Sequence, residues 1–336
     1  MLKHVAASAL AAVLGLALAV PATAQPVEET SMTLPALTLG FAPTYIADEM
    51  GFWTKRGLKV AMHSITGIGS MNAVLSGSVD FTNSSGPTVI RANVRGQKVL
   101  GIGSTYDGLP FELVVRKEVL DAAGVTENSP LDKRVQAIRG KKISLTSPNT
   151  IPHGYLRYFA RKGGLNPDRD FQIASMAAEA GLAGLKTGAI DGYVQGPPWT
   201  VIATHQGLAV RLDSSLRGSM PEMLPFAYNI VAAKPETCEK RPSVCQKLMD
   251  GYLEGMIYMN DKPAESLAIL QKRMPGGDRE VFQEAFDLTR KATPRTTKIN
   301  EKGLQNAQEL SIDALMIKPE EKLAKFDDIF TNKFTK

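Results

Sequence analysis

The chain has 336 residues, with 39 Lys and Arg against 34 Asp and Glu, which gives a formal net charge of +5. Acidic and basic residues are interspersed and no basic run occurs, so the sequence lacks the electrostatic footprint of a nucleic-acid-binding protein. A chain of this length is too long for one compact core and suits two domains of ~150 residues each.

The first 24 residues have the pattern of a cleavable secretory signal peptide. Lys3 and His4 form a short basic region, residues 5–20 are apolar, and Ala22-Thr23-Ala24 supplies the small residues that signal peptidase needs. The alternative is a membrane anchor, but the apolar run has 16 residues and a spanning helix needs ~20. We therefore expect cleavage after Ala24, export to the periplasm, and no membrane-spanning segment in the mature chain.

The two cysteines, Cys238 and Cys245, are seven positions apart. In an oxidising compartment this spacing favours a local disulfide at the start of a helix, and two free buried thiols are the alternative. A metal pair would need further ligands nearby, but His63, His153 and His205 are distant in sequence. We expect neither a metal site nor a cofactor.

Apolar strand patterns alternate with helical patterns after the signal peptide, which predicts an α/β fold. The first strand is expected at 36–41 and the second at 58–65, with a helix between them that begins at Pro43. Gly57 is well placed to end the intervening turn, because glycine takes the left-handed conformation at little cost.

The same order of parts recurs about 110 residues later. Lys55-Arg56-Gly57-Leu58 is echoed by Lys162-Gly163-Gly164-Leu165, and Gly77-Ser78-Val79-Asp80 is echoed by Gly188-Ala189-Ile190-Asp191. This offset is too long for a solenoid repeat and predicts two lobes built from the same α/β unit. Asp80 and Asp191 are expected to be structural, with each carboxylate bonded to backbone N–H groups.

Two segments with the same Pro-Phe start, at 110–116 and 225–233, are predicted to be the strands that cross between the lobes. Lobe two is then a single insertion at 113–224. Lobe one combines 37–110 with 227–336. The tail shows helical spacing without intervening strands, and we expect it to pack on the outside of lobe one as helices over 243–273, 278–291 and 300–316.

The segment LTLGFAPTYIADEMGFWTKRGLKV resembles the opening of the nitrate/sulfonate/taurine-type periplasmic binding proteins, a superfamily that includes receptors for thiamine-pyrimidine precursors. Further matches are LSGSVDF (75–81), RGKKISLTSPNT (139–150) and LKTGAID (185–191). The resemblance implies a type II periplasmic-binding fold, with a small-molecule ligand clamped between two lobes joined by two hinge strands. It also implies a monomer that serves an ABC permease and its ATPase. Many relatives carry Trp-Glu-Pro where this chain has Gly196-Pro197-Pro198. The resemblance therefore does not imply a ligand that is recognised through that Glu.

Ligands of open α/β sheets bind beyond the carboxyl ends of the strands, so the loops at those ends are the candidate site. Three of the loops are rich in hydroxyl groups or glycine and lead into helices, whose free N–H groups bind anions. Ordinary N-capping is the alternative for each loop. The candidate ligand-binding residues are Thr44, Tyr45, Thr66, Gly67, Ser70, Ser84, Ser85, Tyr106, Asn149, Thr150, His153, Gln195 and Trp199.

Several candidates have a second interpretation. Tyr45 could pack in the core, and His153 could be a surface residue rather than a donor to an anion. Tyr106 and Trp199 could sandwich a flat ligand or close the interface between the lobes.

The acidic residues of these loops are Asp107 and Glu179, and no pair of carboxylates that would bind an amine is evident. We therefore expect a small anion or a neutral polar ligand such as a sulfonate or carboxylate, with a pyrimidine-like heterocycle as the alternative. A sensor-linked binding protein is not separable from a transport receptor by sequence.

An enzyme is the rival class. The loop Gly67-Ile68-Gly69 lacks the third glycine of a dinucleotide-binding fingerprint, and the Cys-rich iron motif of the pyrimidine-synthase relatives is missing. We expect no enzymatic activity.

Overall fold

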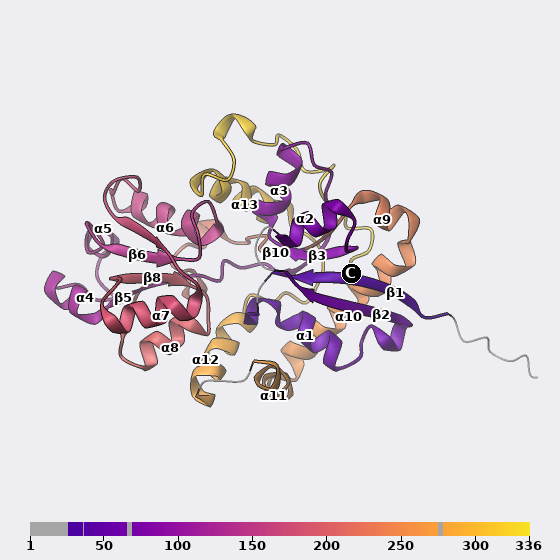
Figure 1. Ribbon diagram of the computed structural model, residues 1–336, viewed down its shortest axis with the longest axis horizontal. Coiled ribbons are helices and arrows are strands. Elements are labelled where there is room, and N and C mark those ends of the chain that lie inside the picture. Colours follow the sequence, from indigo (N-terminus) through magenta and orange to yellow (C-terminus); the bar gives the residue numbers. More distant parts are fainter. Residues whose placement is uncertain (1–25, 36, 66–68, 275–277) are drawn as a thin grey trace, which may run out of the picture.

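The computed structural model describes residues 26–35, 37–65, 69–274 and 278–336. The signal peptide predicted for 1–24 lies outside these residues. The described chain forms two five-stranded sheets that lie side by side, each covered by helices (Figure 1). Within the described residues, no helix has both the length and the apolar character needed to cross a membrane.

The first sheet, which defines lobe one, is parallel except for its fourth strand. Its strands in sheet order are β2 (Leu58–Ser64), β1 (Glu28–Leu34), β3 (Phe81–Ser84), β10 (Asn229–Ala233) and β4 (Leu100–Tyr106). Its helices are α1 (Ala42–Glu49), α2 (Gly69–Ser76) and α3 (Gly86–Val94).

The second sheet, which defines lobe two, repeats this order with an antiparallel fourth strand. Its strands in sheet order are β7 (Gln172–Ser175), β6 (Lys142–Leu145), β8 (Gly192–Gln195), β5 (Glu112–Arg116) and β9 (Ala209–Ser214). Its helices are α4 (Lys117–Ala123), α5 (Leu131–Gln136), α6 (Ile151–Lys162), α7 (Ala178–Thr187) and α8 (Trp199–His205).

The prediction of a first strand at 36–41 is wrong. The strand β1 lies earlier, and Leu39–Phe41 forms a 3₁₀ turn, η1, that leads into α1. Three of the seven β1 residues carry hydroxyl groups, so a pattern of apolar residues does not indicate the strand. The ladder with β2 pairs Glu28 with Leu58 and runs to the end of both strands, so non-local pairing fixes the strand. The first sheet therefore includes Glu28–Leu34, which lies before the lobe-one boundary expected at residue 37.

The repeated Gly-x-x-Asp motif has the same structural role in each lobe. Gly77 and Gly188 have φ values of 77° and 73°, in the left-handed region that favours glycine. Asp80 accepts hydrogen bonds from the Thr30 hydroxyl at 2.6 Å and the Ser31 N–H at 3.3 Å, both on β1. Asp191 accepts the Lys142 N–H at 2.9 Å, at the start of β6. Each carboxylate therefore ties its own strand to the neighbouring strand.

The C-terminal tail is helical, as predicted, but it contacts both lobes. Its helices are α9 (Pro235–Lys240), α10 (Pro242–Asp261), α11 (Pro263–Arg273), α12 (Arg279–Arg290) and α13 (Glu301–Asp313). The helix α13 packs between α3 of lobe one and α6 of lobe two, while α12 packs against η1 and α8 (Figure 1). In the contact between α6 and α13, Gly154 on α6 lies close to the Leu310 carbonyl on α13. A Cβ atom added at Gly154 would lie 2.9 Å from that carbonyl oxygen.

Cys238 and Cys245 form a disulfide that joins α9 to α10, with their Cα atoms 5.7 Å apart. Both side chains are buried in the lobe-one core beside Val244 and Leu248. The bond therefore fixes the corner at which the tail leaves β10.

Replacing both cysteines with serine should lower the free energy of unfolding by about 2–3 kcal/mol, because the unfolded chain regains the entropy of a short loop. Denaturant unfolding with and without a reductant measures this effect. The reductant should destabilise the wild type to the level of the variant and leave the variant unchanged. Equal stability of the variant and the oxidised wild type would contradict this account.

Candidate ligand-binding site

The two lobes are joined by two segments, 107–111 and 215–228, that are hydrogen-bonded to one another. Their backbone bonds run from the Phe226 N–H to the Asp107 carbonyl at 3.1 Å and from the Ser215 N–H to the Phe111 carbonyl at 3.1 Å. These segments form the hinge. The candidate site lies where the hinge meets the carboxyl ends of the parallel strands.

Four aromatic rings form a row across the hinge, which we call the hinge aromatic row. The Tyr106–Tyr228 ring centroids are 5.9 Å apart, Tyr228–Phe111 are 5.8 Å apart, and Phe111–Tyr155 are 6.1 Å apart. Tyr106 ends β4 in lobe one and Tyr155 lies on α6 in lobe two, so the row links the lobes. The first two pairs are edge-to-face and the third is tilted at 44°, and ring contacts of this kind stabilise the junction between the lobes.

The Tyr106 hydroxyl is fully buried and has no hydrogen-bond partner among the described residues. A buried polar group without a partner costs about 1–3 kcal/mol, so a ligand or a water that accepted this hydrogen bond would be held well. Burial raises the pKa of Tyr106, so the hydroxyl keeps its proton and remains a donor. Tyr106 therefore remains the strongest candidate at the hinge.

The hydroxyl loop at the end of β3 is used mainly in helix capping. The Ser85 hydroxyl accepts the Thr88 N–H at 3.2 Å and so caps α3. The Gly86 N–H donates to the Ala227 carbonyl of the hinge at 3.0 Å. Ser84 is half-buried at the end of the strand, and its side chain forms no hydrogen bond with another described residue. Ser84 is thus the hydroxyl of this loop that is available to a ligand.

The loop before α6 is held by its own side chains. The Thr150 hydroxyl donates to the Ser147 carbonyl at 2.5 Å, and the Asn149 N–H donates to His153 Nδ1 at 3.0 Å. Asn149 has a φ of 57°, a left-handed conformation that asparagine tolerates. The amide side chain of Asn149 is left for other contacts.

His153 is buried, and the alternative of a surface histidine is wrong. Burial and the nearby Arg157 lower the pKa of His153 to about 4, so the ring is neutral at pH 7. Because Nδ1 accepts the Asn149 N–H, the proton lies on Nε2 and can be donated. His153 could therefore offer a neutral hydrogen bond to a ligand, but no positive charge.

Three of the candidate residues in lobe one already have contacts within that lobe. Thr44 is buried and accepts a hydrogen bond from Asn83 Nδ2 at 2.9 Å. Tyr45 is buried in the core, and this burial raises its pKa to about 12. The Ser70 hydroxyl donates to the Ile65 carbonyl at 2.5 Å. The core interpretation holds for Tyr45, and the positions of Thr44 and Ser70 do not support the prediction of ligand contact.

Two lobe-two candidates flank the end of β8. Gln195 is half-buried, and its side-chain oxygen accepts the Gly196 N–H at 3.2 Å. Trp199 is half-buried and packs on the satellite core of lobe two that contains Tyr193 and Ala203. Trp199 therefore belongs to its own lobe rather than to a sandwich with Tyr106. Thr66 and Gly67 lie outside the described residues.

The sequence model of the NMT1-like family matches residues 25–271 of the chain. The chain belongs to this family. Among curated relatives, the nitrate/nitrite binding protein NrtA of Synechocystis sp. is 24% identical over 255 residues, which cover 69% of this chain and 54% of that protein. The chain thus spans about half the length of this relative. The bicarbonate transport ATP-binding protein CmpC of the same organism is 24% identical over 183 residues, 52% of this chain and 27% of that protein.

Solved structures of similar fold include two periplasmic binding proteins. The aliphatic sulphonate binding protein SsuA from Escherichia coli matches with a TM-score of 0.68 and 19% identity, covering 84% of this chain and 85% of SsuA. The nitrate-binding protein NrtA from Synechocystis matches with a TM-score of 0.66 and 16% identity, covering 92% and 87%. The predicted fold class, that of the periplasmic binding proteins, is confirmed. SsuA and NrtA are named as binding proteins, in agreement with the prediction that the chain is a binding protein rather than an enzyme.

Sequence reasoning missed three of the four rings in this member of the family. Phe111 and Tyr228 lie in the two Pro-Phe segments, which the sequence pattern predicts only as strands that cross between the lobes. Tyr155 lies two residues after His153 and was not considered. The shared Pro-Phe start was the available signal, because a matched pair of crossings places its aromatic residues at the junction.

Replacing Tyr106 with phenylalanine should leave the free energy of unfolding of the ligand-free protein unchanged or raise it by up to about 1 kcal/mol, because an unpartnered buried hydroxyl is removed. Denaturant unfolding measures this value, and Tyr155→Phe is the matched control. Tyr155 donates to Asp213 Oδ2 at 2.5 Å, so its loss should destabilise the fold. A clear destabilisation by Tyr106→Phe would show that the hydroxyl has a partner.

Asp107 in the hinge should make stability depend on pH. Burial raises the pKa of this carboxyl to about 6, and the Ser104 hydroxyl opposes the shift by donating to it. The stability contributed by protonated Asp107 is fully present below pH 4 and is lost as the pH rises through 6. Asp107→Asn should therefore stabilise the protein by about 1–3 kcal/mol at pH 7.5 and by little at pH 4. Unfolding curves at both values test this, and an effect independent of pH would contradict it.

Proposed function

We propose that this chain is the periplasmic solute-binding receptor of an ABC importer, and that it delivers a small anionic or neutral polar organic ligand by closure of its two lobes. The family match over residues 25–271 carries the proposal. The double-sheet fold with two hinge segments supports it, because two lobes that move about a hinge can enclose a ligand between them.

The proposed partners are an ABC permease and its ATPase, with the chain acting as a monomer. The similarity of part of the ATP-binding protein CmpC to this chain supports a link to ATP-driven import. The signal peptide expected at 1–24 would place the protein in the periplasm.

The side chains at the site favour a ligand without positive charge. The available groups are the Tyr106 hydroxyl, the Ser84 hydroxyl, the Asn149 amide and neutral His153. All four can donate to an oxyanion. The carboxylates next in sequence to the hinge rings are Asp107, which follows Tyr106, and Glu112, which follows Phe111 and accepts a hydrogen bond from Arg211. A sulfonate or carboxylate satisfies these donors without requiring a cationic side chain.

A flat heterocycle such as a thiamine-precursor pyrimidine is the second candidate. The hinge aromatic row favours it, because Tyr228 is half-buried between Tyr106 and Phe111 and offers a ring at the junction. Hydroxyl and amide groups beside the ring would serve the polar edge of such a ligand.

A thermal-shift screen should identify a ligand that raises the melting temperature. Binding to the folded state alone adds about 2.7 kcal/mol at a ligand concentration of 100 Kd, which corresponds to several degrees in a protein of this size. The screen should hold nitrate, bicarbonate, alkanesulfonates, aromatic carboxylates and pyrimidines, with chloride at equal ionic strength as the control. If none of these compounds stabilised a cooperatively folded sample, the receptor proposal would fail.

The position of the site is tested by variants from both lobes. Ser84→Ala in lobe one and Asn149→Gly in lobe two should together weaken the affinity for the ligand found in the screen roughly tenfold or more, as two hydrogen bonds are lost. Glycine is chosen because residue 149 has a positive φ. Ser76→Ala, at the exposed end of α2, is the control. Unchanged affinity by calorimetry would place the ligand elsewhere.

A further inference from the structure

The tail helix α12 is built into lobe one through its apolar face. Val281, Phe282, Ala285 and Phe286 are buried in the same cluster as the core residues of α1 and α10. The helix also packs against η1, which precedes α1. We therefore treat α12 as a rigid part of lobe one.

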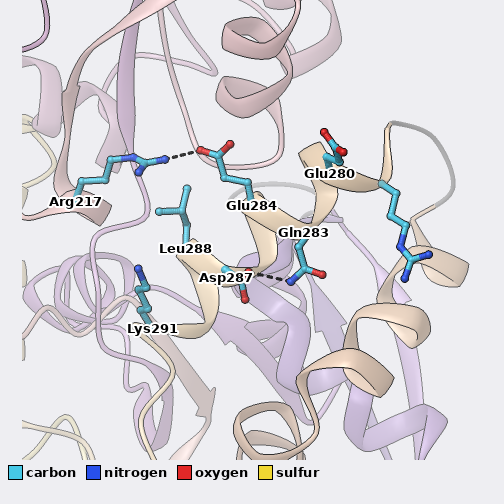
Figure 2. A pocket seen from close by; sticks show the side chains of 8 residues that line it. Arg217, Glu280, Gln283, Glu284, Asp287, Leu288 and Lys291 are labelled. Atoms are coloured by element: carbon cyan, nitrogen blue, oxygen red, sulfur yellow. Dashed lines mark hydrogen bonds and ion pairs between the residues drawn. The ribbon is translucent and has the colours of Figure 1, made fainter.

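The opposite edge of α12 reaches into lobe two through one carboxylate. Glu284 lies 2.5 Å from an Arg217 terminal nitrogen, 2.8 Å from His205 Nε2 and 3.5 Å from an Arg211 terminal nitrogen (Figure 2 shows the Arg217 pair). His205 ends α8, Arg211 lies in β9, and Arg217 lies in the 3₁₀ turn η3 (Ser215–Arg217). One lobe-one side chain therefore contacts two basic groups of lobe two and one at the start of the hinge segment 215–228.

The two arginines are held in place by a buried carboxylate of lobe two. Glu112 is fully buried and accepts a hydrogen bond from Arg211 Nε at 2.7 Å, and Arg217 Nε lies 3.6 Å from it. Glu112 also accepts the Thr200 hydroxyl at 2.6 Å and the Ser214 hydroxyl at 2.7 Å. Glu284 therefore meets cations whose positions are already fixed, so little side-chain entropy is lost when the pairs form.

The contact remains open to solvent on one side. Arg217 and Glu284 line a cavity of about 640 Å³ between η3 and α12, together with Gln283, Leu288 and Lys291 (Figure 2). Beneath the charges, Val201 is buried in the lobe-one cluster, with Ile202 and Leu216 packed against it. Dissolved ions can therefore reach the charged pairs while the apolar contact below them stays dry.

We propose that Glu284 is an interlobe latch: it holds α12 against lobe two and shifts the equilibrium between lobe arrangements toward the one in which these pairs are formed. Rotation about the hinge changes the distances from Glu284 to His205 and Arg211, because these belong to lobe two and α12 packs in the core of lobe one. The latch acts in the ligand-free protein, so it does not depend on the proposed function.

The test measures the distance between the lobes without any ligand. Nitroxide labels on cysteines at the exposed positions Lys98 in lobe one and Lys186 in lobe two are suitable, since both native cysteines are in the disulfide. Pulsed electron paramagnetic resonance should show that Glu284→Gln reduces the population at the interlobe distance of this structure at least about twofold. Glu280→Gln is the matched control on the same helix and should leave the distribution unchanged.

Salt and a second variant distinguish a latch from a purely structural residue. In the wild type, 1 M NaCl should reproduce the shift away from that distance, because the screening length falls to about 3 Å. Salt should add little to Glu284→Gln. Arg217→Gln should act in the same direction, and the double variant should be less than additive.

Unchanged distance distributions in Glu284→Gln, or an equal change in Glu280→Gln, would overturn the latch. If Glu284→Gln proved unstable by circular dichroism, the salt series on the wild type would decide alone. Insensitivity to salt of the population at the interlobe distance of this structure would then overturn the latch. None of these outcomes bears on whether the chain binds a solute.

Discussion

The structure depends on one constraint of strand order: the fourth strand of each sheet is delivered by a crossing from the other lobe. The strand β10 lies between β3 and β4, and β5 lies between β8 and β9, both antiparallel to their neighbours. Because each strand is hydrogen-bonded on both sides, neither crossing can slide without breaking a ladder. Movement of the lobes is therefore confined to 107–111 and 215–228, which act as a pair.

The position of the hinge aromatic row follows from that constraint. Phe111 and Tyr228 lie on the two crossings, while Tyr106 and Tyr155 belong to opposite lobes. Rotation of the lobes changes the contacts within the row, so a ligand bound against it would favour the arrangement in which the row is continuous. Binding and closure are then coupled by differential contacts rather than by a separate switch.

The two-lobe organisation could be predicted because its signals are local. Gly77 and Gly188 need a left-handed turn, and the carboxylates of Asp80 and Asp191 follow at the same spacing, so the repeat is visible in the sequence. The first strand could not be predicted in the same way. Its hydroxyl-rich segment becomes a strand through pairing with Leu58–Ser64, about 30 residues later, and no local pattern records that pairing. The candidate site shows the same limit, because local patterns identify strand ends but not whether Ser85 or Thr44 already has a partner.

The helical tail shows most clearly which contacts amphipathic spacing does not determine. Such spacing requires that α12 and α13 cover apolar surface, but it does not specify which lobe supplies that surface. In the structure α13 packs on both lobes near Gly154, and α12 buries its phenylalanines in lobe one while Glu284 faces lobe two. The lobe arrangement of this structure is therefore stabilised by contacts of the tail as well as by the hinge. Because apparent affinity scales with the population of the binding-competent state, a change on the tail can alter ligand binding without touching the ligand.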